Sequence, residues 1–232
     1  MSEIGTVVFG EGLPRARGFA ALLAEQGVAR GLIGPREVER LWERHLLNSA
    51  VLAELLPRNS RVVDVGSGAG LPGIPLAIAR PDLELVLLEP MARRVEWLRE
   101  VITELELTTE VVRGRAEEEP VRERLGGQDV VTARAVAPLG RLASWCLPLV
   151  RPGGQLLALK GSSAAEELDR DAEAISSAGG GEHRVVSCGD GVLEVPTTVV
   201  EVQRTNGPRP AGGPRKAAGR RRGGTRRTRK DR

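Results

Sequence analysis

Residues 61–70, Arg-Val-Val-Asp-Val-Gly-Ser-Gly-Ala-Gly, decide the fold of this chain. The β-branched apolar run at the start is typical of a strand buried in a parallel sheet. The glycines at positions 66, 68 and 70 then let the backbone turn sharply and approach a ligand closely. The stretch therefore predicts a strand that ends in a loop for a nucleotide-containing cofactor.

Two classes of cofactor use such loops, and the details favour one of them. Dinucleotide loops have the spacing Gly-x-Gly-x-x-Gly and hold a pyrophosphate at a helix N-terminus, but position 71 here is Leu71. Asp64 would repel a pyrophosphate, whereas it suits the sulfonium and ammonium of S-adenosylmethionine (SAM). We therefore predict SAM, with Asp64, Gly66 and Gly68 at its site. NAD stays the alternative, because a glycine-rich loop alone is a weak signal.

Strand and helix patterns alternate after residue 60, which predicts an α/β fold with a mostly parallel sheet and helices on both faces. The seven expected strands are Arg61–Val65, Leu83–Leu88, Glu110–Arg113, Asp129–Ala133, Gln155–Lys160, Arg184–Cys188 and Thr197–Gln203. The expected helices are Gly73–Ala79, Ala92–Leu105, Leu139–Leu149 and Ala164–Ala178. The last two strands have a short connection, and parallel neighbours need a longer crossover, so we expect an antiparallel hairpin there. This Rossmann-like arrangement is typical of SAM-dependent methyltransferases.

Ligands of open α/β sheets bind beyond the carboxyl ends of the strands, so charged residues at those ends are candidate contacts. Glu89 ends the second strand, where an acid can accept both ribose hydroxyls of an adenosine. Glu117 follows the third strand and could meet the adenine, or it could simply be a solvated residue at a helix start. Arg134 ends the fourth strand and could meet the SAM carboxylate, an RNA phosphate or a structural ion-pair partner.

Composition limits the class of protein. The 232 residues contain no apolar run long enough for a membrane helix, and residues 1–12 lack a secretory pattern. Cys146 and Cys188 show no metal-ligand spacing. We therefore expect a cytoplasmic protein without a metal site.

Charged residues are distributed unevenly along the chain. Residues 206–232 hold 11 Lys or Arg and one acid, and the remaining residues hold 23 basic and 30 acidic side chains. The basic tail lacks apolar periodicity and cannot form a core, so we expect it to be disordered. Its charge suits a polyanionic partner such as RNA, and a solubilising or accessory extension is the alternative. We predict an N-terminal helical cap at 1–58, a methyltransferase domain at 59–205 and the tail at 206–232. Within the cap, the expected helices are Pro14–Gly27 and Pro35–Leu56.

The segment after the fourth strand bears on the type of methylation. It reads Ala133-Arg134-Ala135-Val136-Ala137-Pro138, not the Asn/Asp-Pro-Pro-aromatic turn used for exocyclic amines. Methylation of a pyrimidine carbon needs a nucleophilic cysteine near this place, and Cys146 is expected in mid-helix. A ring nitrogen such as guanine N7 carries a lone pair and no proton, so it requires no general base. We therefore predict catalysis by positioning, with no catalytic side chain.

Several further motifs together resemble the bacterial small-subunit ribosomal RNA methyltransferase G family, also called glucose-inhibited division protein B. The resemblance spans roughly residues 35–204 and has an actinobacterial character in Gly31–Pro35. It rests on Leu41-Trp42-Glu43-Arg44-His45-Leu46-Leu47-Asn48-Ser49, on Val63–Leu76 with its Gly-Leu-Pro-Gly-Ile-Pro extension, and on Leu87–Pro90, Arg93–Val95, Arg115–Glu117, Arg134-Ala135 and Ala158–Gly161.

The resemblance implies SAM-dependent N7-methylation of a guanine in 16S rRNA near the decoding centre, with the small ribosomal subunit as partner. By motif match, the residues implied in SAM binding are Gly66, Leu71, Ala116, Glu117 and Arg134, with Glu89 on the ribose. Residues implied more weakly in substrate binding are Arg44, His45, Arg93 and Lys160, although His45 could instead be a buried histidine with satisfied hydrogen bonds. A nicotinamide-dependent dehydrogenase and a non-catalytic RNA-binding assembly factor stay as alternative functions.

Overall fold

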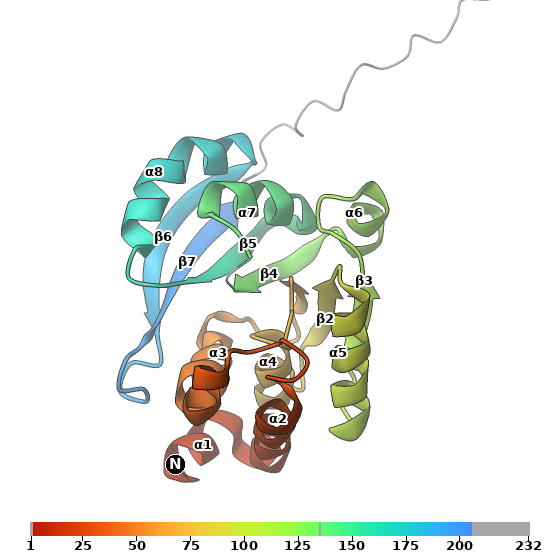
Figure 1. Ribbon diagram of the computed structural model, residues 1–232. Helices are drawn as coiled ribbons and strands as arrows, with labels where there is room; N and C mark the ends of the chain where they lie inside the picture. The colour runs from red at the N-terminus through yellow and green to blue at the C-terminus, as the bar shows by residue number, and fades with distance from the viewer. Residues whose placement is uncertain (1, 135, 206–232) are drawn as a thin grey trace, which may run out of the picture.

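The computed structural model describes residues 2–134 and 136–205, and its centre is a twisted seven-stranded sheet (Figure 1). The strand order across the sheet is β3-β2-β1-β4-β5-β7-β6. The strands are β1 (Arg61–Val65), β2 (Glu84–Glu89), β3 (Glu110–Arg113), β4 (Gln128–Arg134), β5 (Val150–Lys160), β6 (Gly180–Cys188) and β7 (Thr197–Arg204). All seven expected strands are present, and β1 and β3 have the predicted bounds.

Strands β1 to β5 pair in parallel, and β7 runs antiparallel to both β5 and β6. The predicted terminal hairpin is therefore confirmed. The central strand β1 shows the register: Val63 lies opposite Val86 on one side and Val131 on the other. From β1 the chain adds β2 and β3 on one side and then β4 and β5 on the other, so the direction of strand addition reverses between β1 and β4. Open α/β sheets form their ligand crevice at such a reversal.

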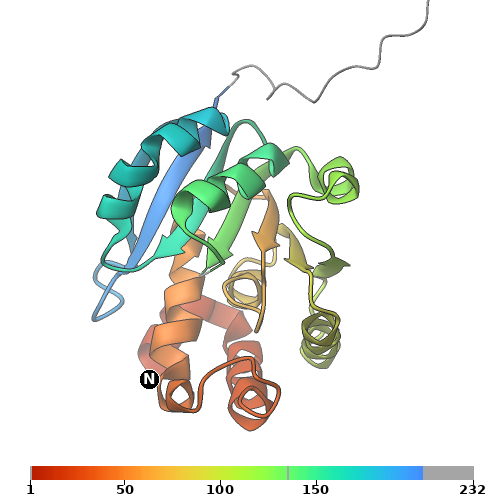
Figure 2. The same ribbon diagram turned by 45° about the horizontal axis from the view of Figure 1, so that its top comes forward.

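Helices cover both faces of the sheet (Figures 1 and 2). Successive strand residues point to opposite faces, so Val62 packs in one hydrophobic core and Val63 in the other. The first core lies beneath the N-terminal helices, α4 (Gly73–Ala79) and α5 (Ala92–Glu104). The second lies beneath α6 (Glu119–Leu125), α7 (Leu139–Cys146) with the 3₁₀ turn η5 (Leu147–Leu149), and α8 (Ala164–Ser177).

The N-terminal region contains more helical segments than the sequence pattern indicates. Helix α1 (Ser2–Phe9) and the turn η1 (Gly10–Gly12) precede α2 (Leu13–Gln26). Glycine and β-branched residues give α1 low intrinsic helix propensity, and packing compensates: Phe9 is buried and its ring centroid lies 5.9 Å from that of Trp42.

The second expected helix, Pro35–Leu56, is helical but not continuous. It begins as the 3₁₀ segment η2 (Pro35–Arg40), widens into the π-helical η3 (Leu41–Leu47), and ends as α3 (Asn48–Ala50) and the 3₁₀ segment η4 (Val51–Leu55). The prediction of one regular helix is therefore corrected. The change of helix type at Arg40 and Leu41 alters which side chains can meet, with consequences for the site below.

The N-terminal helices are a layer of the same core as the sheet. Phe19, Leu23 and Leu46 are fully buried in one cluster with Val62 and Leu87. The boundary at residue 58 stays a prediction, and the expected tail, 206–232, lies outside the described residues. Over the described part of the chain, no helix combines the length and apolarity that a membrane crossing requires.

Candidate cofactor site

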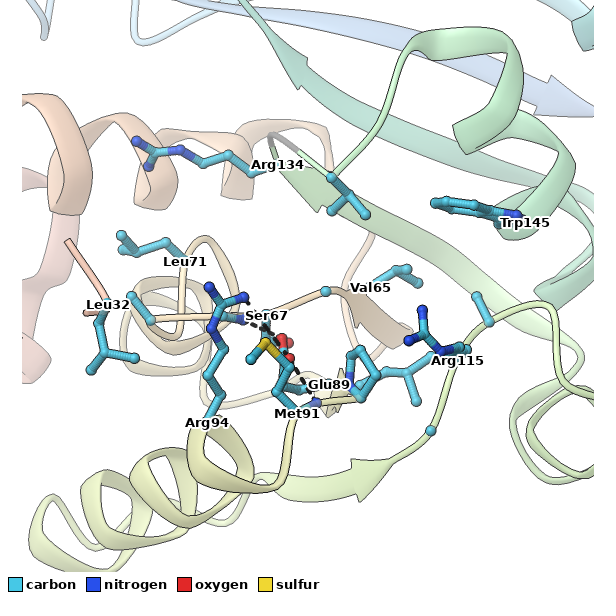
Figure 3. A pocket seen from close by; sticks show the side chains of 18 of the residues that line it. Leu32, Val65, Ser67, Leu71, Glu89, Met91, Arg94, Arg115, Arg134 and Trp145 are labelled. Carbon is cyan, nitrogen blue, oxygen red and sulfur yellow. Dashed lines mark hydrogen bonds and ion pairs between the residues drawn. The ribbon is translucent and has the colours of Figure 1, made fainter. Parts of the chain in front are cut away.

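A cavity of about 650 Å³ opens at the carboxyl ends of β1 to β4, beside the N-terminal helical stretch (Figure 3). Its volume is in the range of small-molecule sites. Seven of the eight predicted cofactor residues line it, along with two of the four weaker substrate candidates. These residues are Gly66, Gly68, Leu71, Glu89, Ala116, Glu117 and Arg134, with Arg44 and His45.

The glycine loop has the conformation that its sequence predicts. Gly66, Gly68 and Gly70 have φ angles of +71°, +55° and +100°, in the region that side-chain-bearing residues rarely adopt. The loop is fixed from below, because the amides of Gly66 and Ser67 donate to the Leu88 carbonyl at 2.8 and 3.2 Å. At Gly66 and Gly68 the loop so held presents bare backbone to the cavity.

A buried tryptophan adds a second anchor for this loop. The Trp97 indole nitrogen donates to the Ala69 carbonyl at 3.0 Å, and the side chain is almost fully buried. Helix α5 thereby fixes the loop position relative to the sheet.

Glu89 lies beneath the loop at the end of β2, as predicted. It is only 1% exposed, yet it lines the cavity. The Gly68 amide donates to Oε2 at 2.9 Å and the Met91 amide donates to Oε1 at 3.0 Å. The Arg94 guanidinium lies 4.0 Å from Oε1. A carboxylate has about four lone-pair sites, so Glu89 keeps acceptor capacity for a ligand hydroxyl.

The structure places Asp64 behind the loop, not in the cavity wall. Asp64 is fully buried and accepts hydrogen bonds from the Gly73 amide at 3.1 Å and the Thr132 hydroxyl at 3.3 Å. Burial raises the pKa of this carboxyl to about 6. The expectation of direct ligand contact is therefore corrected: Asp64 joins β1 to the start of α4 and to β4, and so supports the loop.

Arg134 extends from the end of β4 toward the N-terminal helical stretch, where Figure 3 shows its guanidinium at the cavity edge. One terminal nitrogen donates to the Ser49 hydroxyl at 3.1 Å and the other to His45 Nδ1 at 2.5 Å. His45 Nε2 lies 2.6 Å from a Glu37 carboxylate oxygen. Both partners of Arg134 are uncharged groups, so its positive charge remains available to an anion.

Two weaker substrate candidates lie outside the cavity. Arg93 is exposed on the first turn of α5, whereas its neighbour Arg94 lines the cavity. Lys160 is nearly buried, donates to the Ala137 carbonyl at 3.1 Å and pairs with Glu167 at 2.8 Å. Lys160 therefore joins β5 to α8 and does not line the cavity, and its contact with substrate stays a prediction.

Several residues of the cavity wall have no distinguishing signal in the sequence. Adjacent helix residues point about 100° apart, so the choice between Arg93 and Arg94 depended on how α5 lies on the sheet. Trp145 lines the cavity from α7, and Figure 3 shows it toward the same end as Arg115. A bulky aromatic that faces a cavity from a helix is indistinguishable from a core residue in the sequence pattern.

The topology and the strand-end cavity define the class of protein: a Rossmann-like fold of the SAM-dependent methyltransferase type. Aeropyrum pernix fibrillarin, solved with bound S-adenosylmethionine, matches with a TM-score of 0.51 and 21% identity over 68% of this chain and 74% of its own. The SAM-dependent methyltransferase SibL matches with a TM-score of 0.55 and 21% identity over 73% of this chain and 57% of its own. At these identities the likeness shows the fold alone.

Sequence comparison identifies the family. Residues 13–195 match the family described as rRNA small subunit methyltransferase G. Proteins of that name from Mycobacterium marinum and Corynebacterium jeikeium are 56% and 58% identical, over 90% and 85% of this chain and 92% and 89% of their own length. The chain therefore belongs to the rRNA small subunit methyltransferase G family, which is SAM-dependent. This confirms the resemblance, its actinobacterial character and the choice of SAM over a nicotinamide cofactor.

Proposed function

We propose that this chain transfers a methyl group from SAM to N7 of a guanine in 16S rRNA near the decoding centre, acting in the cytoplasm on the small ribosomal subunit. Family membership supports methylation of small-subunit rRNA. The proposal at the level of residues rests on one observation: the glycine loop, Glu89 and Arg134 line the same cavity.

The residues present fit the chemistry of SAM. The spare acceptor sites of Glu89 suit ribose hydroxyls. Arg134, whose hydrogen-bond partners are a histidine and a serine, suits the carboxylate of the methionine part, because arginine and carboxylate form strong charge-assisted hydrogen bonds. The loop from Gly66 to Gly68 presents its backbone closely to the bound molecule.

We assign the adenine to the end of the cavity that contains Ala116, Glu117 and Trp145. Backbone groups of Ala116 and Glu117 can meet the ring edge, as the sequence analysis expects. Trp145 adds an apolar face on which a base can stack, and base–aromatic stacking is worth roughly 1–3 kcal/mol per base. Quenching of tryptophan fluorescence on SAM addition, lost in Trp145→Leu, would support this assignment. Quenching that persists in Trp145→Leu would contradict it.

In the proposed mechanism the protein positions SAM and the guanine, and it transfers no proton. Guanine N7 has a lone pair and no proton, so it can attack directly. When bound, SAM supplies an electrophilic methyl carbon. The chain's own residues hold the donor in one orientation and leave the mouth of the cavity open to the base, which reduces the entropy cost of bringing the reactants together.

Recognition of the target guanine must leave N7 accessible. Arginine commonly binds guanine through O6 and N7 together, and that geometry would block the reaction. We therefore expect contacts to O6 or the Watson–Crick edge. Arg44, half exposed at the cavity rim, and the exposed Arg93 are candidates for RNA contact, as is the basic segment 206–232.

The decisive experiment is labelled methyl transfer to small ribosomal subunits that lack the modification, followed by identification of the labelled nucleoside. We expect 7-methylguanosine. Label on any other atom would refute the proposed chemistry, and tight binding of a nicotinamide coenzyme without SAM binding would refute the cofactor assignment. The same assay with the chain ended after Arg204 tests the basic segment: an unchanged rate and salt dependence would remove its proposed RNA contact.

A further inference from the structure

Arg134 is a mostly buried cation whose protein partners are neutral. Among the described residues, no carboxylate lies within ion-pair distance of its guanidinium, and burial lowers its pKa. Arginine stays protonated in proteins even so. Its hydrogen bonds to Ser49 and His45 use one N–H on each terminal nitrogen. The other N–H groups remain for a ligand in the cavity that Arg134 lines.

The bond to Arg134 fixes the tautomer of His45. A guanidinium only donates hydrogen bonds, so His45 Nδ1 must carry a lone pair and the ring proton must be on Nε2. That nitrogen lies 2.6 Å from Glu37 Oε2, which accepts the proton's hydrogen bond. Burial and the charge of Arg134 lower the pKa of His45, which favours this neutral ring. The hydrogen bond to His45 lowers the pKa of Glu37, which favours its carboxylate form.

The irregular helix makes this chain of contacts possible. In a straight α-helix, residues 37 and 45 would be about 12 Å apart along the axis. Side chains that lie side by side on a regular helix are three or four residues apart in sequence, not eight. The 3₁₀ segment η2 ends at Arg40 and the π-helical η3 begins at Leu41, and across this change Glu37 contacts His45. Short π-helical segments are often found at functional sites.

We propose that Glu37 and His45 are positioning residues for the cofactor: Glu37 fixes the His45 tautomer, and His45 orients Arg134 toward the carboxylate of SAM. The inference rests on the proposed function, since it takes Arg134 as the partner of that carboxylate. It assigns the N-terminal helical stretch a part in cofactor binding, because the orientation of a strand-end arginine depends on a residue about one hundred positions earlier in the chain.

The tautomer can be tested without any substitution at the site. The chain has only two histidines, His45 and His183, so ¹⁵N-histidine NMR gives two sets of ring signals that a His183→Gln variant assigns. We expect His45 as the Nε2–H tautomer in the intact protein at neutral pH. Observation of the Nδ1–H tautomer would overturn the proposal, because that form offers Arg134 no acceptor.

Variants then test the effect on the cofactor by calorimetry and steady-state kinetics. We expect Glu37→Ala and His45→Leu to weaken SAM binding about tenfold, as the loss of one charge-assisted contact would, and to raise KM for SAM with kcat changed less than twofold. Glu37→Gln keeps an acceptor oxygen and should retain affinity within about threefold. Glu39→Gln, an exposed acid on the same segment, is the matched control and should bind like the parent.

The outcomes distinguish failure of the proposed function from failure of the positioning role alone. If the parent protein binds no SAM, the proposed function fails and this inference with it. If the parent binds SAM and Arg134→Leu weakens it, but Glu37→Ala and His45→Leu bind normally, the positioning role alone is refuted. Equal losses in Glu37→Gln and Glu37→Ala would also refute it, because the acceptor oxygen would then be irrelevant.

Discussion

Replacement of Glu89 by glutamine tests both the loop support and the ribose contact at one position. The substitution preserves the size of the side chain but converts one acceptor oxygen into an NH₂ donor. At present each carboxylate oxygen accepts one backbone N–H, from Gly68 at 2.9 Å and from Met91 at 3.0 Å. In the variant, one of these amides must face another donor.

The structure sets the expected size of the effect. Glu89 is 1% exposed, so water cannot replace the lost acceptor at little cost. A buried donor left without a partner costs roughly 1–3 kcal/mol. We therefore expect the free energy of unfolding of Glu89→Gln to fall by about 2 kcal/mol. Cofactor affinity should fall further, by roughly tenfold to a hundredfold, because a charged acceptor for ribose hydroxyls is also lost.

Urea denaturation followed by tryptophan fluorescence measures the first effect, and calorimetric titration with SAM measures the second. Glu84→Gln is the matched control, because Glu84 begins the same strand and is exposed. It should change neither quantity appreciably. A Glu89→Gln variant as stable as the parent, with unchanged SAM affinity, would refute both the support and the ribose assignment.

Other substitutions test the loop, the buried acid and the N-terminal layer. Gly66→Ala should destabilise the fold by about 1 kcal/mol more than Gly68→Ala in urea denaturation. An added Cβ at position 66 would lie 2.8 Å from the Val136 side chain, whereas an added Cβ at position 68 would have its nearest neighbour at 3.6 Å. Equal losses of stability in the two variants would contradict this. For Asp64, the folded-state pKa of about 6 exceeds the ordinary 3.8, so its contribution to stability is complete below pH 4 and is lost as pH rises through 6. Parent stability should therefore fall relative to Asp64→Asn by roughly 3 kcal/mol between pH 4 and 7, and a constant difference would refute the raised pKa. Arg80→Met removes a guanidinium that donates to three backbone carbonyls at the end of the N-terminal layer. It should lower the free energy of unfolding by roughly 2–4 kcal/mol and leave SAM affinity unchanged. A loss of SAM affinity in a folded variant would show that the site is coupled to this contact.

Much of the sheet could be predicted because its signals are local. The β-branched run Arg61–Val65 and the glycines after it act through short-range sterics, so the bounds of β1 and the turn of the loop follow from the residues themselves. The predicted hairpin of β6 and β7 follows from the length of their connection. The function was predicted from family motifs, since one fold can support many different chemistries.

The sequence by itself determined the succession of strands and helices along the chain, the glycine loop and the strand-end acid Glu89. Each of these features depends on a few neighbouring residues. The tertiary structure decided the rest of the site. The packing angle of α5 turns Arg94 rather than Arg93 to the cavity, the depth of β1 places Asp64 behind the loop, and the change of helix type at Leu41 brings Glu37 to His45. These outcomes depend on contacts between segments distant in sequence, where rotation of a helix by one residue or a local change in its pitch redirects every side chain it carries.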